Sequence, residues 1–240
     1  MSAPPRTDAI AQPAQILRLA LRAYLRYAVP LTLLAGAVLA PWLAVALTAR
    51  APADPAGAQV ALRTAWLLGA TAWIGQLLLV GAAAPLVRAL DTGAPLSQLR
   101  ALSGGARQLA RAAVPWLAAV AAIALGGLAL ALPGLALLVL LSTTAASTRS
   151  GLPAPLAESA ELVRRCFPLA VAAVAALLVI DLGAVLLAQA LLRPPPAAKL
   201  RPEQLAMFRR MVEVVAIAIV FAAPPIAALL AALHARAARA

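Results

Sequence analysis

The sequence contains few of the residues on which catalytic and metal sites depend. Its 240 residues include one cysteine, Cys166, and one histidine, His234. A single cysteine excludes an intrachain disulfide and a thiolate metal site. No phosphate-binding loop, HExxH sequence or Gly-x-Ser-x-Gly sequence is present. We therefore expect no cofactor and no metal, and we predict that the protein is not an enzyme.

Charged residues are also scarce. They make up 12% of the chain and hydrophobic residues 64%, whereas a soluble domain has about 25% and about 45–50%. Five runs with almost no charge each reach the length of about 20 residues that crosses a bilayer as a helix. They are residues 27–49, 64–87, 112–148, 166–192 (which includes Asp181) and 214–235. The composition predicts an all-α, polytopic transmembrane helix bundle that forms a single integral membrane domain over residues 1–240.

The charge that is present is mostly positive. The chain has 20 basic and 8 acidic residues, which gives a formal net charge of +12. The basic residues cluster in the short segments between apolar runs, where Lys and Arg set topology and meet anionic headgroups. This placement explains the charge without nucleic acid. We expect membrane lipids, mainly anionic ones, as partners, with protein partners or self-association as further possibilities.

An arginine precedes a proline by four residues ahead of three of the apolar runs. The segment before each proline has the composition of an amphipathic helix, and two apolar spans can follow it. We therefore predict three repeat-like units, about 13–90, 95–148 and 153–235, each an interfacial amphipathic helix followed by two spans. The three pairs are Arg26 and Pro30, Arg111 and Pro115, and Arg164 and Pro168.

The arginines of these interfacial helices are the candidate lipid-binding residues. In the first unit they recur every four residues, which places them in one stripe of a helix, and apolar residues fill much of the remaining circumference. This pattern is typical of a helix that lies in the membrane interface with its arginines toward headgroups. The candidate headgroup-binding residues are Arg18, Arg22, Arg26, Arg107, Arg111, Arg164 and Arg165.

The second and third interfacial helices have recognisable starts. A glycine turn is expected at Gly93 and at Gly151. Each is followed by a proline, Pro95 or Pro155, that suits the first position of a helix.

Residues 115–147 determine whether the chain has five or six spans. As one helix these 33 residues would be about 50 Å long, against a hydrocarbon core of about 30 Å. Leu132-Pro133-Gly134 is expected to divide them into a tight hairpin with halves of about 25 Å each. The positive-inside rule does not choose between five and six spans, because both topologies place equally many basic residues on the cytoplasmic side. Only six spans place all three interfacial helices on one face, with both termini in the cytoplasm.

One stretch of the sequence resembles a known family. It begins with Leu132-Pro133-Gly134 and continues with a turn at Gly151 and a helix that contains Ser159, Leu162 and Arg164. In these residues the chain resembles the membrane domain of bacterial glycerophosphoryl diester phosphodiesterases and related uncharacterised six-transmembrane bacterial proteins. The resemblance implies a multi-pass protein of the bacterial inner (cell) membrane. The catalytic phosphodiesterase domain of that family is not among these residues, so its activity is not carried over.

Two features inside the apolar runs bear on function. Asp181 falls near the bilayer midplane, where a charge costs about 2.5–3.5 kcal/mol. We therefore expect its carboxyl group to face the bundle, protonated or hydrogen bonded, with Gln76, Ser142 or Thr143 as partner. Pro224-Pro225 is expected to interrupt the last span near its middle, and a broken helix is one mark of a transport site.

Two functions stay open at this point. The arginine stripes favour a non-enzymatic integral membrane protein, a membrane scaffold or a bundle that interacts with lipids or partners. The alternative is a small transporter or permease that uses Asp181 and a broken helix at Pro224-Pro225. A transporter usually carries more polar groups near the midplane, and Asp181 is nearly alone there, so the sequence favours the first function.

Overall fold

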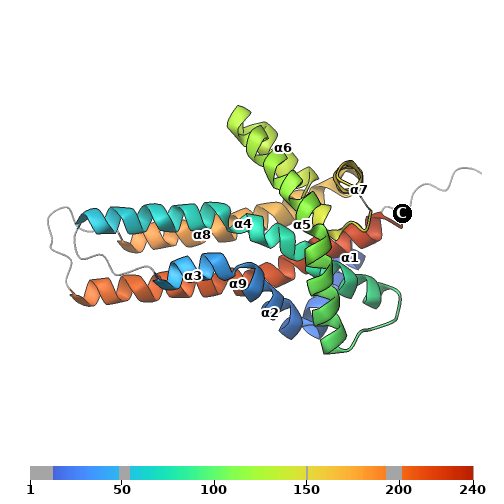
Figure 1. Ribbon diagram of the computed structural model, residues 1–240, viewed down its shortest axis with the longest axis horizontal. Helices are drawn as coiled ribbons and strands as arrows, with labels where there is room; N and C mark the ends of the chain where they lie inside the picture. Colours follow the sequence, from blue (N-terminus) through green and yellow to red (C-terminus); the bar gives the residue numbers. More distant parts are fainter. Residues whose placement is uncertain (1–12, 49–54, 150, 193–201, 240) are drawn as a thin grey trace, which may run out of the picture.

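The computed structural model describes residues 13–48, 55–149, 151–192 and 202–239 (Figure 1). Within these ranges the chain forms helices and turns and contains no β-strand, so the all-α class is confirmed. The elements are α1 (Pro13–Arg26), α2 (Ala28–Val38), α3 (Ala40–Thr48), α4 (Pro55–Asp91), α5 (Gln98–Ala129), α6 (Ala131–Leu140), the short 3₁₀ helix η1 (Thr144–Ala146), α7 (Pro153–Arg165), α8 (Phe167–Leu192) and α9 (Pro202–Ala237).

Three segments of the described chain are long and apolar enough to cross a membrane. They are Thr71–Asp91 in α4, all of α5, and Ile219–Ala237 in α9. A fourth candidate is the pair Pro153–Arg165 and Phe167–Gly183, which is bent by 107° between its two helices. These three to four candidate spans fit a membrane protein, and the count of six stays a prediction.

Small side chains hold the long helices together. Helices α4, α8 and α9 lie side by side along the long axis of the molecule (Figure 1) and contact one another. Alanines recur on the buried surfaces of α4 and α9, where Ala82, Ala83, Ala227 and Ala228 are at most 1% exposed. Small residues let helix backbones approach closely, which is the usual source of helix association in a bilayer.

The chain changes direction at the end of two of the three predicted interfacial helices. α1 ends at Arg26 and α2 begins at Ala28, with the fully buried Tyr27 at the junction. α7 ends at Arg165, and the bend of 107° follows before α8. The first and third predicted helices are therefore separate elements ahead of an apolar helix.

The second predicted interfacial helix is not separate, because α5 continues without a break through Pro115. A proline inside a helix removes one N–H and frees the carbonyl four residues earlier, which here belongs to Arg111. Arg111 is an exposed residue, so water or headgroups are near the turn that contains the freed carbonyl. The cost of continuing the helix is therefore lower here than in the apolar interior.

Both expected glycine turns are present, but the helices after them start elsewhere than predicted. Gly93 has φ +73° and Gly151 has φ +87°, a left-handed conformation that favours glycine. α7 begins at Pro153, two residues before the predicted proline. α5 begins after Pro95, and Ser97 caps it instead by accepting a hydrogen bond from a backbone N–H in the first turn at 3.5 Å.

A hairpin joins α5 and α6, as expected, but its two arms are unequal. The break is at Leu130, which is extended with φ −163° and ψ 144°. Pro133 instead falls in the first turn of α6, where its missing N–H costs nothing. A Cβ added at Gly134 would lie 2.6 Å from the Cα of Gly127, so the two backbones are in close contact. α6 has 10 residues, about 15 Å of helix, so the expectation of two arms of about 25 Å was wrong.

The expectation of a broken last span was also wrong. α9 is continuous over Pro202–Ala237 and contains both Pro224 and Pro225. The two prolines free the carbonyls of Val220 and Phe221 from their usual helical partners. The flanking turns keep their hydrogen bonds and are held by packing, since Ala223 is 1% exposed. Helix continuity is thus maintained by the neighbouring helices despite the two lost donors.

Candidate functional site

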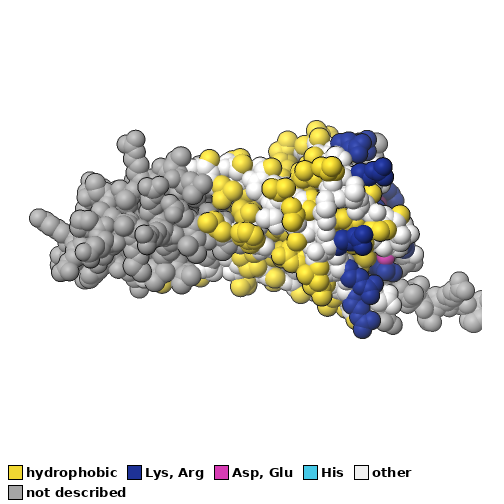
Figure 2. Space-filling view, turned by 90° about the horizontal axis from the view of Figure 1, so that it is seen from below, with side chains coloured by type: hydrophobic (Ala, Val, Ile, Leu, Met, Phe, Trp, Pro, Cys, Tyr) yellow, Lys and Arg dark blue, Asp and Glu magenta, His cyan; other side chains and the backbone are white. Residues whose placement is uncertain are grey.

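Arginine side chains gather at one end of the molecule (Figure 2), the end at which α1, α7 and the C terminus lie (Figure 1). We call it the basic end. It brings together residues from α1, α5 and α7, the three regions that the sequence marked as candidates for headgroup binding. All seven of these residues are exposed: Arg18, Arg22, Arg26, Arg107, Arg111, Arg164 and Arg165.

α1 exposes leucines beside its arginines. Leu17, Leu21 and Leu25 are 50%, 58% and 67% exposed, and each directly precedes one arginine of the stripe. The opposite face is buried against the bundle through Ile16, Leu19, Ala20 and Ala23. A leucine stripe next to an arginine stripe suits a helix whose leucines enter the acyl boundary while its arginines stay among headgroups.

Few of these arginines are neutralised by carboxylates. Arg165 pairs with Glu161 at 2.9 Å on the exposed face of α7. Arg107 donates through Nε to the Ser103 carbonyl at 3.3 Å. The other five form no ion pair within the described part of the chain. Most of the positive charge at this end is therefore available to an external anion.

An ion-pair cluster at the same end joins α4 to α9. Asp91 Oδ1 lies 2.6 Å from Arg236 Nη2, and Asp91 Oδ2 lies 2.5 Å from Arg239 Nη1. The carboxylate side chain is 1% exposed, whereas the arginines are 34% and 47% exposed. Sequence reasoning missed this contact, because Asp91 and its two arginines are far apart in the chain and belong to no shared motif.

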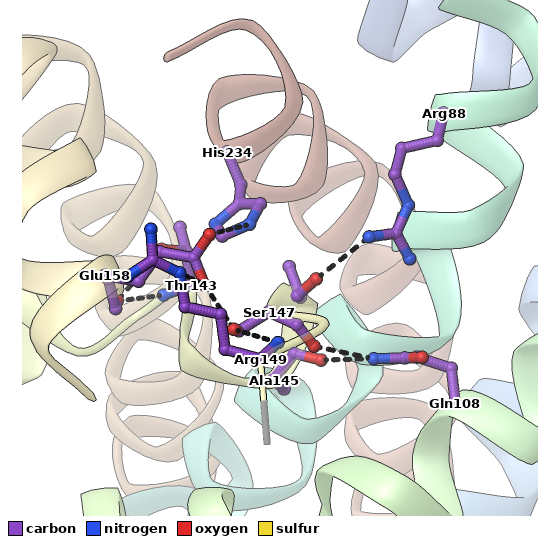
Figure 3. Close-up of polar contacts among 10 residues, drawn as sticks. Arg88, Gln108, Thr143, Ala145, Ser147, Arg149, Glu158 and His234 are labelled. Carbon is purple, nitrogen blue, oxygen red and sulfur yellow. Dashed lines mark hydrogen bonds and ion pairs between the residues drawn. The ribbon is translucent and has the colours of Figure 1, made fainter. Parts of the chain in front are cut away.

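A buried loop over residues 141–147 forms the polar centre of the basic end (Figure 3). Its backbone carbonyls accept hydrogen bonds from two helices. Gln108 on α5 donates to Ala145 at 3.4 Å and to Ser147 at 3.0 Å. Arg88 on α4 donates to Ala146 at 3.4 Å. Three backbone carbonyls of the loop are thus satisfied by side chains that are distant in sequence.

Glu158 of α7 links this loop to α9. Its carboxylate accepts a hydrogen bond from Ser147 and lies 3.7 Å from Arg149 Nε and 3.9 Å from His234 Nε2. Ser147 contacts the carboxylate and not the imidazole, so these residues do not form the nucleophile, imidazole and carboxylate sequence of a Ser-His relay. The arrangement instead connects α7, α9 and the loop.

Two of the candidate partners of Asp181 belong to this loop and form their hydrogen bonds elsewhere. Ser142 donates to the Val139 carbonyl at 2.8 Å. Thr143 shares a hydrogen bond with Ser159 of α7 at 2.9 Å. Neither of these two candidates contacts Asp181, because the loop packs at the basic end.

The third candidate partner does contact Asp181. Gln76 Nε2 on α4 donates to Asp181 Oδ1 on α8 at 2.6 Å, and the two residues are 2% and 1% exposed. The remaining oxygens, Gln76 Oε1 and Asp181 Oδ2, have no hydrogen-bond partner within the described residues. The pair is therefore a buried polar link between two long helices, and two of its acceptor atoms accept no hydrogen bond from the described residues.

No group of three or more His, Cys, Asp or Glu side chains in the described ranges is placed to hold a metal ion. Comparisons of the chain with protein families, curated proteins and solved structures found no match. Function must therefore be inferred from the two polar regions themselves, the basic end and the buried pair.

Proposed function

We propose that this chain is a non-enzymatic integral membrane protein that organises anionic lipid, or holds a partner at the lipid surface, through its basic end. The observation that carries the proposal is the convergence of seven exposed arginines from three helices at one end of the molecule. Near an anionic membrane surface each such residue contributes about 1 kcal/mol. A membrane scaffold of this kind needs a charged, exposed surface and no reaction centre.

The leucine stripe of α1 adds an apolar component to this attraction. It continues into α2 through Val29 and Leu33, which are 68% and 57% exposed. An amphipathic helix binds an interface through buried apolar area together with attraction to anionic lipid. The combination on α1 therefore favours a lipid surface over a soluble acidic ligand.

The proposal includes six spans in a bacterial inner membrane, with both termini cytoplasmic. The start of α1 and the end of α9 lie at the same end of the molecule (Figure 1), and the two helices contact each other. This arrangement supports an even number of spans. Consecutive α2 and α3 would form one span, and α6 with the loop that follows would form the short arm of another. Reporters fused after Ala240 and near Asp54 test the topology, and an external C terminus would overturn it.

Replacement of Arg18, Arg22 and Arg26 by glutamine tests the lipid proposal. The variant should copurify with less phosphatidylglycerol than the wild type, measured by lipid mass spectrometry on protein extracted in an uncharged detergent. The matched control replaces the same three residues by lysine, which keeps the charge and should retain the lipid. Equal phosphatidylglycerol content in all three proteins would contradict the proposal.

The buried pair favours a second candidate function, a small transporter. A carboxylate and an amide in the core, each with an oxygen that lacks a hydrogen-bond partner within the described chain, are groups that a proton or a cation can bind. In proteoliposomes with an imposed pH gradient, Asp181→Asn would then abolish a flux that the wild type supports. Absence of flux in the wild type would eliminate this candidate.

A further inference from the structure

A pocket of about 490 Å³ lies at the basic end, between α5 and the segment that leads into α7. Its size falls within the range of about 300–1,000 Å³ that is usual for small-ligand sites. Gln108 and Ser147, which are hydrogen bonded to each other in Figure 3, form part of its wall. The bonds that hold the buried loop in place therefore also fix one side of the pocket.

One residue that lines this pocket has a buried hydroxyl without a partner in the described chain. Thr144 is 3% exposed, and its Oγ1 has no hydrogen-bond partner within the described part of the protein. Buried polar atoms are almost always hydrogen bonded, and an exception calls for an absent ligand, water or ion. The neighbouring hydroxyl of Ser147 already donates to Glu158. Thr144 is therefore a residue of the pocket wall whose hydroxyl is free to bind a ligand, and the hydroxyl of Thr148 lies in the same wall.

Two guanidinium groups give the pocket its charge. Arg111 lines it from α5, and no ion pair in the described residues engages this side chain. Arg149 lines it from the loop side and is 60% exposed, with its Nε 3.7 Å from Glu158. That contact uses only the inner edge of the guanidinium, so the terminal nitrogens can bind an anion. No carboxylate lines the pocket, so an anion there meets positive charge and hydroxyl groups.

Apart from Thr148, the remaining wall is apolar, and it lies next to the arginines that would meet the headgroups. Val114 and Pro115 follow Arg111 on α5, and Leu152 lies opposite, ahead of α7. Arg111 is the last charged residue of α5 before its apolar segment. A ligand in the pocket would therefore have its anionic group beside the arginines and an apolar part along α5.

We propose that this pocket binds the phosphate group of one anionic phospholipid. Arg111 and Arg149 hold the phosphate oxygens, the Thr144 hydroxyl donates to one of them, and the acyl region leaves along Val114 and Leu152. A free phosphate ester shares the same anionic chemistry. The proposal rests on the proposed function, in that the basic end must meet anionic lipid, and adds a single defined site to that diffuse surface.

Native mass spectrometry of the full chain, titrated with phosphatidylglycerol in an uncharged detergent, tests the site. The wild type should bind one phosphatidylglycerol more tightly than all further ones. Arg111→Gln removes a charge-assisted hydrogen bond and should weaken this binding about tenfold. Thr144→Val keeps the shape of the side chain and should weaken it about threefold. The matched control, Arg100→Gln, removes an exposed charge from α5 outside the pocket and should leave the tight site unchanged.

Equal affinity in the wild type and both pocket variants, with unchanged melting temperatures, would overturn the proposal.

Added inorganic phosphate distinguishes the two sources of the ligand. Displacement of the tight lipid assigns the site to phosphate esters in general, and persistence of the lipid assigns it to a phospholipid with its chains in place. If the variant with glutamine at Arg18, Arg22 and Arg26 loses lipid while Arg111→Gln does not weaken binding, the pocket proposal is contradicted and the proposed function is supported. If only Arg111→Gln weakens binding, the pocket proposal is supported and the role of the α1 arginines is contradicted.

Discussion

Replacement of Asp181 tests whether the buried pair stabilises the bundle. Asp181→Leu removes the acceptor of the Gln76 amide, whose own oxygen already has no partner within the described chain. A buried polar group that loses its only hydrogen bond costs about 1–3 kcal/mol. Asp181→Asn keeps an acceptor oxygen at the same position and should change the free energy of unfolding by less than about 0.5 kcal/mol.

Unfolding by sodium dodecyl sulfate in mixed micelles measures both changes. Gln76→Leu alone should destabilise the protein because it leaves the carboxyl group buried without its donor. The double variant, with leucine at both positions, should be less destabilised than the sum of the two single variants, because neither polar group is then left alone. The expected coupling is about 0.6 kcal/mol and no more than about 1.7 kcal/mol, the range found for hydrogen bonds between membrane helices.

If Asp181→Leu were as stable as the wild type, the pair would not be a structural link. Equal losses in the asparagine and leucine variants would show that something other than this hydrogen bond is being measured.

Substitutions at three other contacts test further parts of the fold. Gly134→Ala places a methyl group 2.6 Å from Gly127 Cα and should destabilise the α5–α6 hairpin by about 1–3 kcal/mol. The control is Gly127→Ala, whose methyl group meets nothing within 4 Å and which should be neutral or stabilising in the same thermal melt. Asp91→Asn removes the buried anion shared by two partly exposed arginines and should cost about 1.5–3 kcal/mol, the usual range for a hydrogen bond to a charged group. Tyr27→Phe leaves the backbone N–H of Leu96 without its acceptor at 2.8 Å and should cost about 1 kcal/mol. An unchanged melting temperature would contradict each of the three losses.

Features that depend on neighbours in the sequence were predictable. The arginine stripe of α1 follows from a spacing of four residues, and that spacing fixes a helix face wherever the helix lies. The turns at Gly93 and Gly151 follow from the backbone freedom of glycine, and both have positive φ. The hairpin after α5 follows from length alone, since 33 uncharged residues exceed the thickness of a bilayer.

Proline was a less reliable guide, because its effect depends on what surrounds the freed carbonyls. The chain changes direction next to Pro30 and Pro168, yet it continues as a helix through Pro115 and through Pro224-Pro225. A proline removes the same donor in each case. Whether the helix breaks is decided by packing and access to water around that turn, and these are properties of the assembled bundle.

The partners of the polar residues were the least predictable part of the site. Gln108 and Arg88 bind carbonyls of a loop that is 37 and 58 residues away in the chain. Their spacing in the sequence contains no sign of this contact. The visible signal was the run Ser142-Thr143-Thr144 inside an otherwise apolar segment, which needs hydrogen-bond partners wherever it is buried.

That polar run also explains why the second arm of the hairpin is short. If α6 continued as a straight apolar arm, Ser142 and the two threonines after it would enter the bilayer on a lone helix. Instead α6 ends at Leu140, and the loop turns back against α4. The approach is close, because a Cβ added at Gly81 would lie 2.8 Å from the Ala145 carbonyl oxygen. The loop thereby reaches donors on α4 and α5, and the same turn places Thr144 in the wall of the pocket with the two arginines.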